Sequence, residues 1–374
     1  MATNCRDCGS DLPAPGVEES GVEEPAPALP VPKLIDPLDL EALIDFADGF
    51  HRPDWAKVWQ WIEQAIDPEE RQDARNEAAL FWVSQLRKDL GGNYSIWLSK
   101  HTVLLCEQSP DIARWLLDYT ERTATTIEQR LGNLAWRDAP ARRVVLVFSD
   151  QDDFYQYVAF HLLEGEHPAV GAVCIHSGYT HVAIPWTDYL DVANSIAHEL
   201  VHDCLAHLPL PIWLNEGVAV VLQKLIAPPR RYIGQGEQQA LSSGAINWRA
   251  PVMWAELAER HFAFWNEAHM QSFWAGTSFH EPGDANELSY SLAEVLVTLL
   301  NEQGKDMVFR AFLAAAHRND AGQTAALDIL DVDLGVAAGT FLGPGNWRPL
   351  RKKLVEQWKA AGWSSDNVPR KEEL

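Results

Sequence analysis

The chain has 374 residues, of which 53 are acidic and 30 basic, so its formal net charge at pH 7 is -23. Apolar residues make up 47% of the sequence and charged residues 22%, the balance of a water-soluble protein that can bury a core without disulfide bonds. The excess of acid excludes a typical nucleic-acid binder, and the absence of any run of about 18 apolar residues predicts no membrane span.

The N-terminal segment 1–37 is rich in Pro and in acidic pairs, a composition that predicts a disordered tail. It contains Cys5 and Cys8 in a CxxCG sequence, which is similar to one half of a zinc ribbon, and no second CxxC follows. Two interpretations stay open: a pair of free thiols, or a metal site shared with a protein partner. The first residues lack the apolar stretch of a signal peptide, and the few scattered cysteines favour a cytoplasmic location.

Residues 38–92 carry apolar side chains at helical spacing and predict a helical extension, with a helix start at Asp67–Glu70. The next segment, 93–226, alternates apolar runs with helical patterns, which predicts an α+β domain with a mixed sheet. The expected elements of that segment are a strand over 94–106, a helix over 109–131, a strand over 142–148, a helix over 150–163, and a hairpin formed by 170–176 and 179–185.

The helix expected over Asp191–Ala206 contains His198, Glu199 and His202 in an HExxH pattern. Histidines four residues apart lie on the same helix face, so both imidazoles can reach one metal ion. Glu199 lies beside them, where its carboxylate can take a proton from a water activated by the metal. The alternative is a buried helix whose imidazoles only form hydrogen bonds.

A second apolar helix is expected from Pro211 to Ile226, and Glu216 lies in its first turns. If this helix folds back on the HExxH helix, Glu216 can supply a third ligand and leave a fourth position open for water. An interaction of Glu216 with the helix dipole is the alternative. His207 is a rival third ligand, but the metzincin pattern places its third His six residues after the second, where this chain has Leu208.

The sequence HELVH followed by PIWLNEG resembles the gluzincin branch of the zincin metallopeptidases, specifically the bacterial peptidase-MA-like domains, over residues 94–345. The resemblance implies a zincin-like fold, Zn²⁺ bound by His198, His202 and Glu216, Glu199 as general base, and a peptide or protein substrate. Thirteen residues separate His202 from Glu216, fewer than in thermolysin-like relatives, so no substrate specificity is carried over.

The resemblance also implies an edge strand and an oxyanion donor. The strand Tyr179–Pro185 is expected at the sheet edge, where an extended peptide can pair with it, and Pro185 suits an edge; an ordinary covered hairpin is the alternative. Tyr290 is the expected donor to the oxyanion, with a packing role as its alternative. His280 and Tyr179 are weaker candidates for the same role.

The remaining residues are expected to support the site. The segment 227–287 is rich in Gly, Pro and Trp and predicts loops that wall a substrate site, interrupted by a helix over 252–265. The segment 288–374 predicts helices, the first of them ending at Gly304. Four residues near the motif are assigned supporting roles: Asp203 as a possible hydrogen-bond partner of a ligand, Cys204 as core, and His176 and His181 as sheet surface or cleft wall.

The sequence therefore predicts a zinc-dependent peptidase. Two alternatives remain: an inactive zincin that binds peptides or partners, and an assembly module tethered through Cys5 and Cys8.

Overall fold

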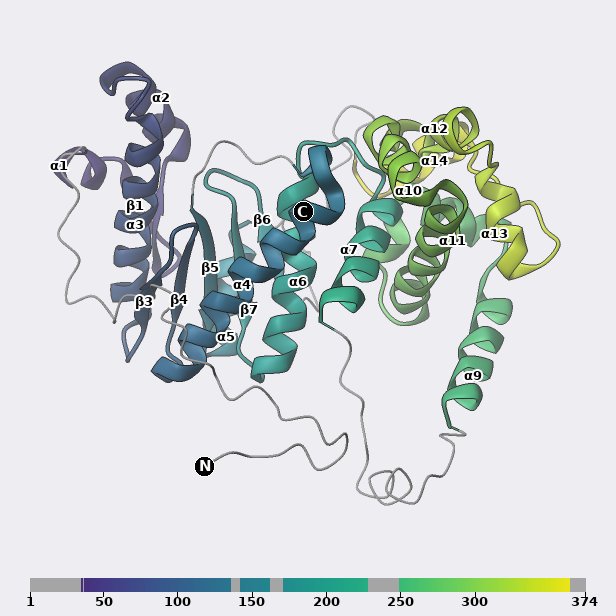
Figure 1. Ribbon diagram of the computed structural model, residues 1–374, viewed down its shortest axis with the longest axis horizontal. Coiled ribbons are helices and arrows are strands. Elements are labelled where there is room, and N and C mark those ends of the chain that lie inside the picture. The colour runs from purple at the N-terminus through teal and green to yellow at the C-terminus, as the bar shows by residue number, and fades with distance from the viewer. Residues whose placement is uncertain (1–34, 36, 136–141, 162–170, 228–248, 364–374) are drawn as a thin grey trace.

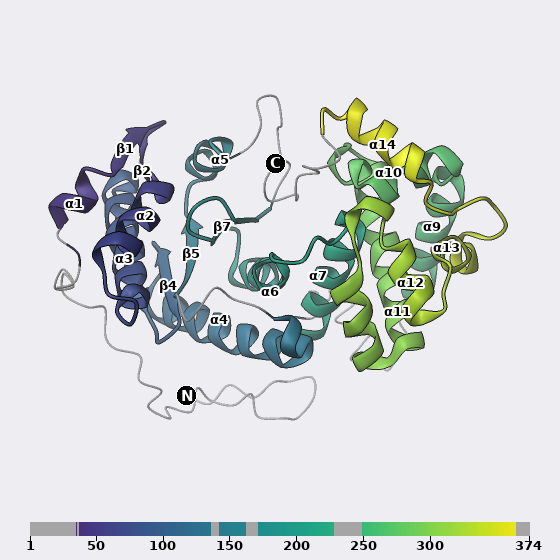
Figure 2. The ribbon, with the colours of Figure 1, turned by 90° about the horizontal axis from the view of Figure 1, so that it is seen from above.

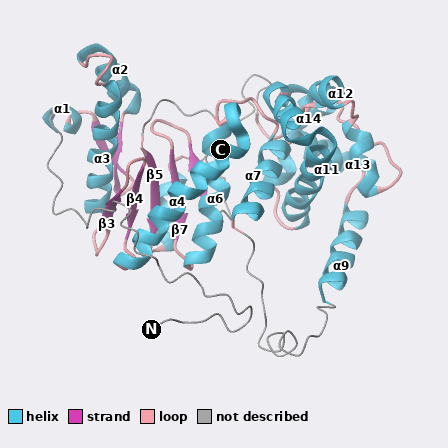
Figure 3. Cartoon of the chain, in the orientation of Figure 1, coloured by secondary structure: helices cyan, strands magenta, loops and turns pink. Residues whose placement is uncertain are grey.

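The computed structural model describes residues 35, 37–135, 142–161, 171–227 and 249–363. Helices and a small hairpin occupy one end of the molecule, a sheet flanked by helices lies in the middle, and helices alone form the other end (Figures 1 and 3). The chain is thus α+β with a mixed sheet, as expected. Cys5 and Cys8 lie outside the described residues.

The central sheet has five strands in the order β3-β4-β5-β7-β6. The inner strands β4, β5 and β7 run parallel, and the outer strands β3 and β6 are antiparallel to their neighbours. The strands are β3 (Ser95–Leu98), β4 (Thr102–Cys106), β5 (Arg143–Phe148), β6 (Val173–Ile175) and β7 (His181–Pro185).

Both faces of the sheet are covered by helices, which explains why the run Arg143–Phe148 is apolar almost throughout. Val145 and Val147 belong to the apolar cluster shared with α4 and α6, whereas Val144 and Leu146 belong to the cluster shared with α3 and α5. Figure 2 shows the sheet between these helices. The helices are α3 (Arg71–Leu90), α4 (Pro110–Leu131), α5 (Gln151–Ala159) and α6 (Tyr189–Leu205).

Two strand predictions are wrong. The strand Tyr179–Pro185 is not an edge: β7 pairs with β5 on one side and β6 on the other, so β6 is the outer strand. Pro185 lies opposite Phe148 within the sheet rather than on a solvent edge. The stretch 94–106 forms the antiparallel pair β3 and β4 instead of one strand, because the chain turns back between Leu98 and Thr102.

The extension 38–92 is only partly helical. It contains α1 (Pro37–Glu41), α2 (Trp55–Ala65) and α3, but also a hairpin of β1 (Ile44–Ala47) and β2 (Phe50–Pro53). Asp48 and Gly49 have φ of 51° and 83°, the pair of positive values that a two-residue type I′ hairpin turn needs. The helix expected to start at Asp67 begins three residues after Pro68, at Arg71.

The C-terminal part is helical. The helix expected over 252–265 is confirmed, whereas the loops expected over 266–287 are wrong, because most of these residues are helical. Lys305 has φ 54°, so the long helix α11 bends at the expected end near Gly304 and then continues. The elements are α9 (Arg249–Phe264), α10 (Glu267–Ala275), η2 (Thr277–His280), α11 (Asp284–Ala315), η3 (Arg318–Asp320), α12 (Gln323–Leu330), α13 (Leu334–Leu342) and α14 (Arg351–Ala360).

None of the helices in the described part of the chain combines the length and the apolar character that a membrane-spanning segment needs.

His181 lies in the apolar cluster between the sheet and α3 and α5, not on the sheet surface or in a cleft wall. Its Nδ1–H donates to the Tyr179 carbonyl (2.7 Å), and its Nε2 accepts from the Tyr157 hydroxyl (2.7 Å). Burial, together with the nearby His176 and Arg52, lowers the pKa of His181 to about 4. The ring is therefore neutral and fully hydrogen-bonded in the folded protein.

This lowered pKa makes the folded state less stable in acid. The unfolded His181 takes up a proton below pH 6.5 and the folded one only near pH 4, so the contribution present above pH 6.5 is lost as the pH falls to 4. Between pH 7 and pH 4, the wild type should lose on the order of 3 kcal/mol more unfolding free energy than His181→Gln, measured by urea denaturation. Equal losses in the two proteins would contradict the assignment.

Candidate metal centre

The helix α6 is held with one apolar face on the sheet and one polar face away from it. The Asp188 side chain caps its start by accepting from the amides of Leu190 and Asp191. Val192 and Ile196 are fully buried in the cluster beneath. A polar face remains, in which Asn194, His198 and His202 follow one another at intervals of four residues.

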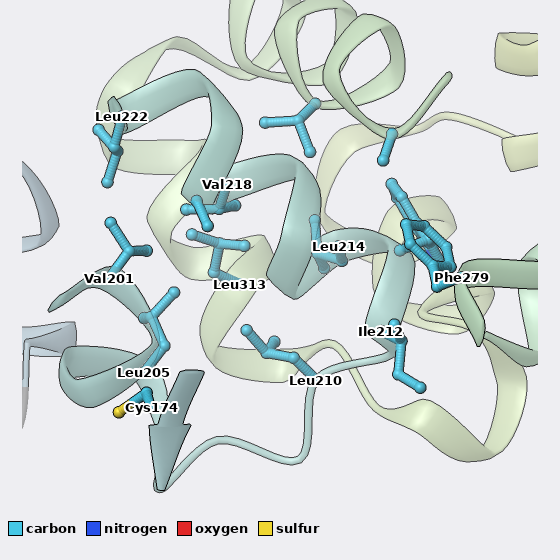
Figure 4. Packing of buried hydrophobic residues seen from close by; sticks show 14 of the residues in the cluster. Cys174, Val201, Leu205, Leu210, Ile212, Leu214, Val218, Leu222, Phe279 and Leu313 are labelled. Carbon is cyan, nitrogen blue, oxygen red and sulfur yellow. The ribbon is translucent and has the colours of Figure 1, made fainter. Parts of the chain in front are cut away.

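The helix α7 (Ile212–Ile226) folds back against α6, as the sequence predicts, and the two helices pack along their length. Trp213, in its first turn, is completely buried and donates from Nε1 to the Ala321 carbonyl (3.0 Å), which fixes the start of α7 to the C-terminal helices. Figure 4 shows Leu205 of α6, Leu214 and Val218 of α7 and Leu313 of α11 in the apolar cluster that holds these helices together.

The three expected ligands converge between α6 and α7. Glu216 Oε2 lies 3.2 Å from His198 Nε2 and 3.7 Å from His202 Nε2, and one ligand atom from each residue lies within 4.8 Å of the others. Two ligands held about 2.0–2.1 Å from a tetrahedral Zn²⁺ are roughly 3.3 Å apart, so both Glu216 distances fit such an ion. Within the described residues this is the only such group of three or more His, Cys, Asp or Glu.

The group is withdrawn from water. The side chains of Glu216 and His202 are 0% and 3% exposed, and that of His198 is 14% exposed. A carboxylate in such a place needs a cation or several hydrogen bonds to offset the loss of hydration. Glu199, the next residue along α6, is 7% exposed, so the expected base shares the same dry surroundings.

Gln223 is a participant that the sequence reasoning missed. It lies on α7 seven residues after Glu216, two turns along the same face, and its Oε1 is 3.1 Å from His198 Nδ1. An amide oxygen can only accept, so His198 carries a proton on Nδ1, and in the neutral ring the lone pair is on Nε2. The seven-residue spacing from the predicted ligand Glu216 is the signal in the sequence that could have found it.

This assignment places two acceptors against each other. Nε2 of His198 and the carboxylate of Glu216 are 3.2 Å apart, and in the neutral Nδ1–H ring neither supplies a proton to the other. With the neutral ring, such a contact is stabilised by a cation between the two atoms, either a proton or a metal ion. A proton would serve one contact, whereas a metal ion also satisfies His202, which points its own Nε2 at the same carboxylate oxygen.

The structure places the other predicted residues as follows. Tyr290 of α11 is partly buried and stacks edge-on against the Phe279 ring, with ring centroids 5.2 Å apart. Tyr179 donates its hydroxyl to the Arg142 carbonyl on the α3 and α5 side of the sheet, and His280 is exposed and contacts Trp363. Tyr179 thus lies on the opposite face of the sheet from α6. His207 is exposed in the turn after α6 and is not part of the ligand group.

Asp203 and Cys204 anchor the end of α6. Asp203 pairs with the buried Arg143 of β5 (3.5 Å), which also pairs with Glu128 of α4. Burial alone would lower the pKa of Arg143, but the neighbouring acids outweigh it and raise that pKa. Cys204 is fully buried in the core, as expected. The ion pairs of Arg143 thereby connect β5 to α4 and to α6, at the residue that follows His202.

Comparison with protein-family models finds no match for this chain, and comparison with curated proteins finds none either.

Gly217 sets how closely α11 approaches the glutamate. A Cβ at this position would lie 2.6 Å from Val297 Cγ2 and 2.7 Å from the Ala293 carbonyl oxygen, both on α11. Part of this contact is backbone, which cannot move without moving the whole helix. The Gly of the NEG sequence is therefore required by helix packing beside Glu216.

Gly217→Ala should lower the free energy of unfolding by about 1–3 kcal/mol, because the added methyl group overpacks the α7–α11 contact. The matched control is Gly339→Ala in α13, where the nearest atom is 3.4 Å from the added Cβ and the change should be neutral or stabilising. Chemical denaturation of both variants gives the comparison. Equal changes in unfolding free energy at the two glycines would contradict the idea that close packing of α7 on α11 requires a glycine at position 217.

Proposed function

We propose that the chain is a zinc-dependent peptidase with a zincin-like fold of the gluzincin branch. The observation that carries this proposal is the buried convergence of three ligand atoms, with Glu216 Oε2 lying 3.2 Å from His198 Nε2 and 3.7 Å from His202 Nε2. Two imidazoles and one carboxylate form the ligand set typical of catalytic zinc sites, in which the fourth position takes water. The HExxH and NEG sequences supply these residues in the order found in gluzincins.

The reaction proposed is hydrolysis of a peptide bond. A zinc ion held by His198, His202 and Glu216 supplies Lewis acidity that polarises the substrate carbonyl and makes water more acidic. Glu199 accepts a proton from the attacking water and passes it to the leaving amine nitrogen, so no net proton is gained or lost by the protein. The low exposure of Glu199 strengthens its interactions with charge that develops nearby.

Tyr290 is proposed as a donor to the oxyanion. The helix α11 reaches the metal ligands closely, since its Ala293 carbonyl abuts Gly217, next to Glu216. Tyr290 lies one turn before Ala293 on the same helix, and its ring is held by Phe279. A phenol in that neighbourhood can donate a hydrogen bond to a negative oxygen formed during hydrolysis.

The remaining parts of the proposal concern the substrate, the cellular location and a protein partner. We propose peptides or proteins as substrates, a cytoplasmic location, and contact with a protein partner through the tail that carries Cys5 and Cys8. The decisive experiment incubates zinc-loaded protein with a mixed peptide library and identifies products by mass spectrometry, with the Glu199→Gln protein as control. Products formed equally by both proteins, or by neither, would reject the peptidase proposal.

A further inference from the structure

The polar contact between α6 and α7 extends beyond the ligands. Asn194 lies one turn before His198 on α6, and its Oδ1 accepts from Gln223 Nε2 at 3.4 Å. Its own Nδ2 donates to the Leu190 carbonyl oxygen at 2.9 Å. Leu190, Asn194, Gln223 and His198 thus form one continuous chain of hydrogen bonds that ends at a proposed metal ligand.

Each donor in this chain is determined by the group before it. The Leu190 carbonyl can only accept, so Asn194 must present its NH₂ there and its oxygen to Gln223. Gln223 must then present its NH₂ to Asn194 and its oxygen to His198 Nδ1. A backbone carbonyl therefore decides which nitrogen of His198 carries the proton.

We infer that Asn194 and Gln223 are positioning residues that hold His198 with Nδ1 protonated and Nε2 available to the metal. Partners of this kind fix the ring orientation and raise the basicity of a ligating histidine. Gln223 offers a neutral acceptor where many metal sites use a carboxylate, so the group carries no extra negative charge behind His198. The inference rests on the proposed metal centre but not on peptidase activity.

The test measures the zinc dissociation constant by competition with a chromogenic chelator, on four proteins: wild type, Gln223→Leu, Asn194→Leu and the double variant. Gln223→Leu should bind zinc about 10- to 100-fold more weakly, and Asn194→Leu about tenfold more weakly. Because Asn194 acts only through Gln223, Asn194→Leu should add nothing in the Gln223→Leu background. Gln223→Glu, which retains an acceptor, should bind at least as tightly as wild type.

A second measurement distinguishes positioning from general packing. In the zinc-loaded protein, the His198 Nδ1 proton should give an NMR signal that exchanges slowly with water, and both leucine variants should lose that protection. Lys224→Leu is the matched control: it removes a 2.6 Å contact with Glu294 from the next position of α7 and should leave zinc affinity unchanged.

Two results would overturn the inference: wild-type zinc affinity in Gln223→Leu, or fully additive effects in the double variant. Failure of the proposed metal centre looks different, because His198→Ala would then bind zinc as tightly as wild type. A protein that binds zinc as described but cleaves no peptide rejects the peptidase proposal alone.

Discussion

Glu199→Gln is expected to lower the rate of peptide hydrolysis by a factor on the order of 10² to 10⁴, the usual contribution of a positioned general base. Gln has the shape of Glu but cannot accept a proton from water at neutral pH. Because Glu199 is adjacent to the ligands rather than one of them, zinc content should remain that of the wild type. Initial rates on a cleaved peptide and elemental analysis of the same preparation measure both quantities.

The control for this variant is another carboxylate of the same helix. Asp191 is exposed in the first turn of α6, two turns before His198, so Asp191→Asn removes one negative charge without touching the site. Its hydrolysis rate should stay close to that of the wild type. Full activity in Glu199→Gln would contradict the mechanism, and equal losses in both variants would point to a general effect of charge or folding.

The second large effect concerns the metal. His198→Ala is expected to weaken zinc binding on the order of 100- to 1,000-fold, since a protein zinc site with a binding free energy of about 10–16 kcal/mol shares it among about four ligands. The variant also removes the contact between His198 and the buried Glu216, so its thermal stability without metal should change too. Metal competition titration and calorimetry provide the two measurements.

Two further variants make this result specific. His207→Ala removes an exposed histidine from the turn that follows α6, and zinc affinity should not change. Cys5→Ser removes a thiol from the N-terminal tail. If zinc were lost in Cys5→Ser but retained in His198→Ala, the metal site would lie in the N-terminal tail. That result would reject the proposed centre between α6 and α7.

The sequence predicted the parts of the site that depend on helix periodicity. His198 and His202 lie on one face of α6 because four residues make about one turn, and Glu216 reaches them because α7 follows after a short loop. The short apolar run at 142–148 likewise identified β5. In each case the information lies within one element or in two elements that are adjacent in the chain.

The failures share another cause. Hydrophobic spacing in 38–53 is compatible with a helix, but Asp48 and Gly49 adopt positive φ and turn the chain into a hairpin. The composition of 266–287 suggested loops, yet burial against the other helices makes most of these residues helical. In the first segment, the turn at Asp48 and Gly49 outweighed the hydrophobic spacing that suggested a helix. In the second segment, packing against other helices outweighed the composition that suggested loops.

What the sequence alone determined about this protein is the group of three side chains, His198, His202 and Glu216, that α6 and α7 bring together. Tertiary structure decided which strand forms the sheet edge, because strand order depends on pairing between distant segments. It also decided that Gln223 Oε1 reaches His198 Nδ1, since the position of α7 is set by contacts with α11 such as that at Gly217. Those contacts join residues far apart in the chain, where sequence spacing carries no information about distance.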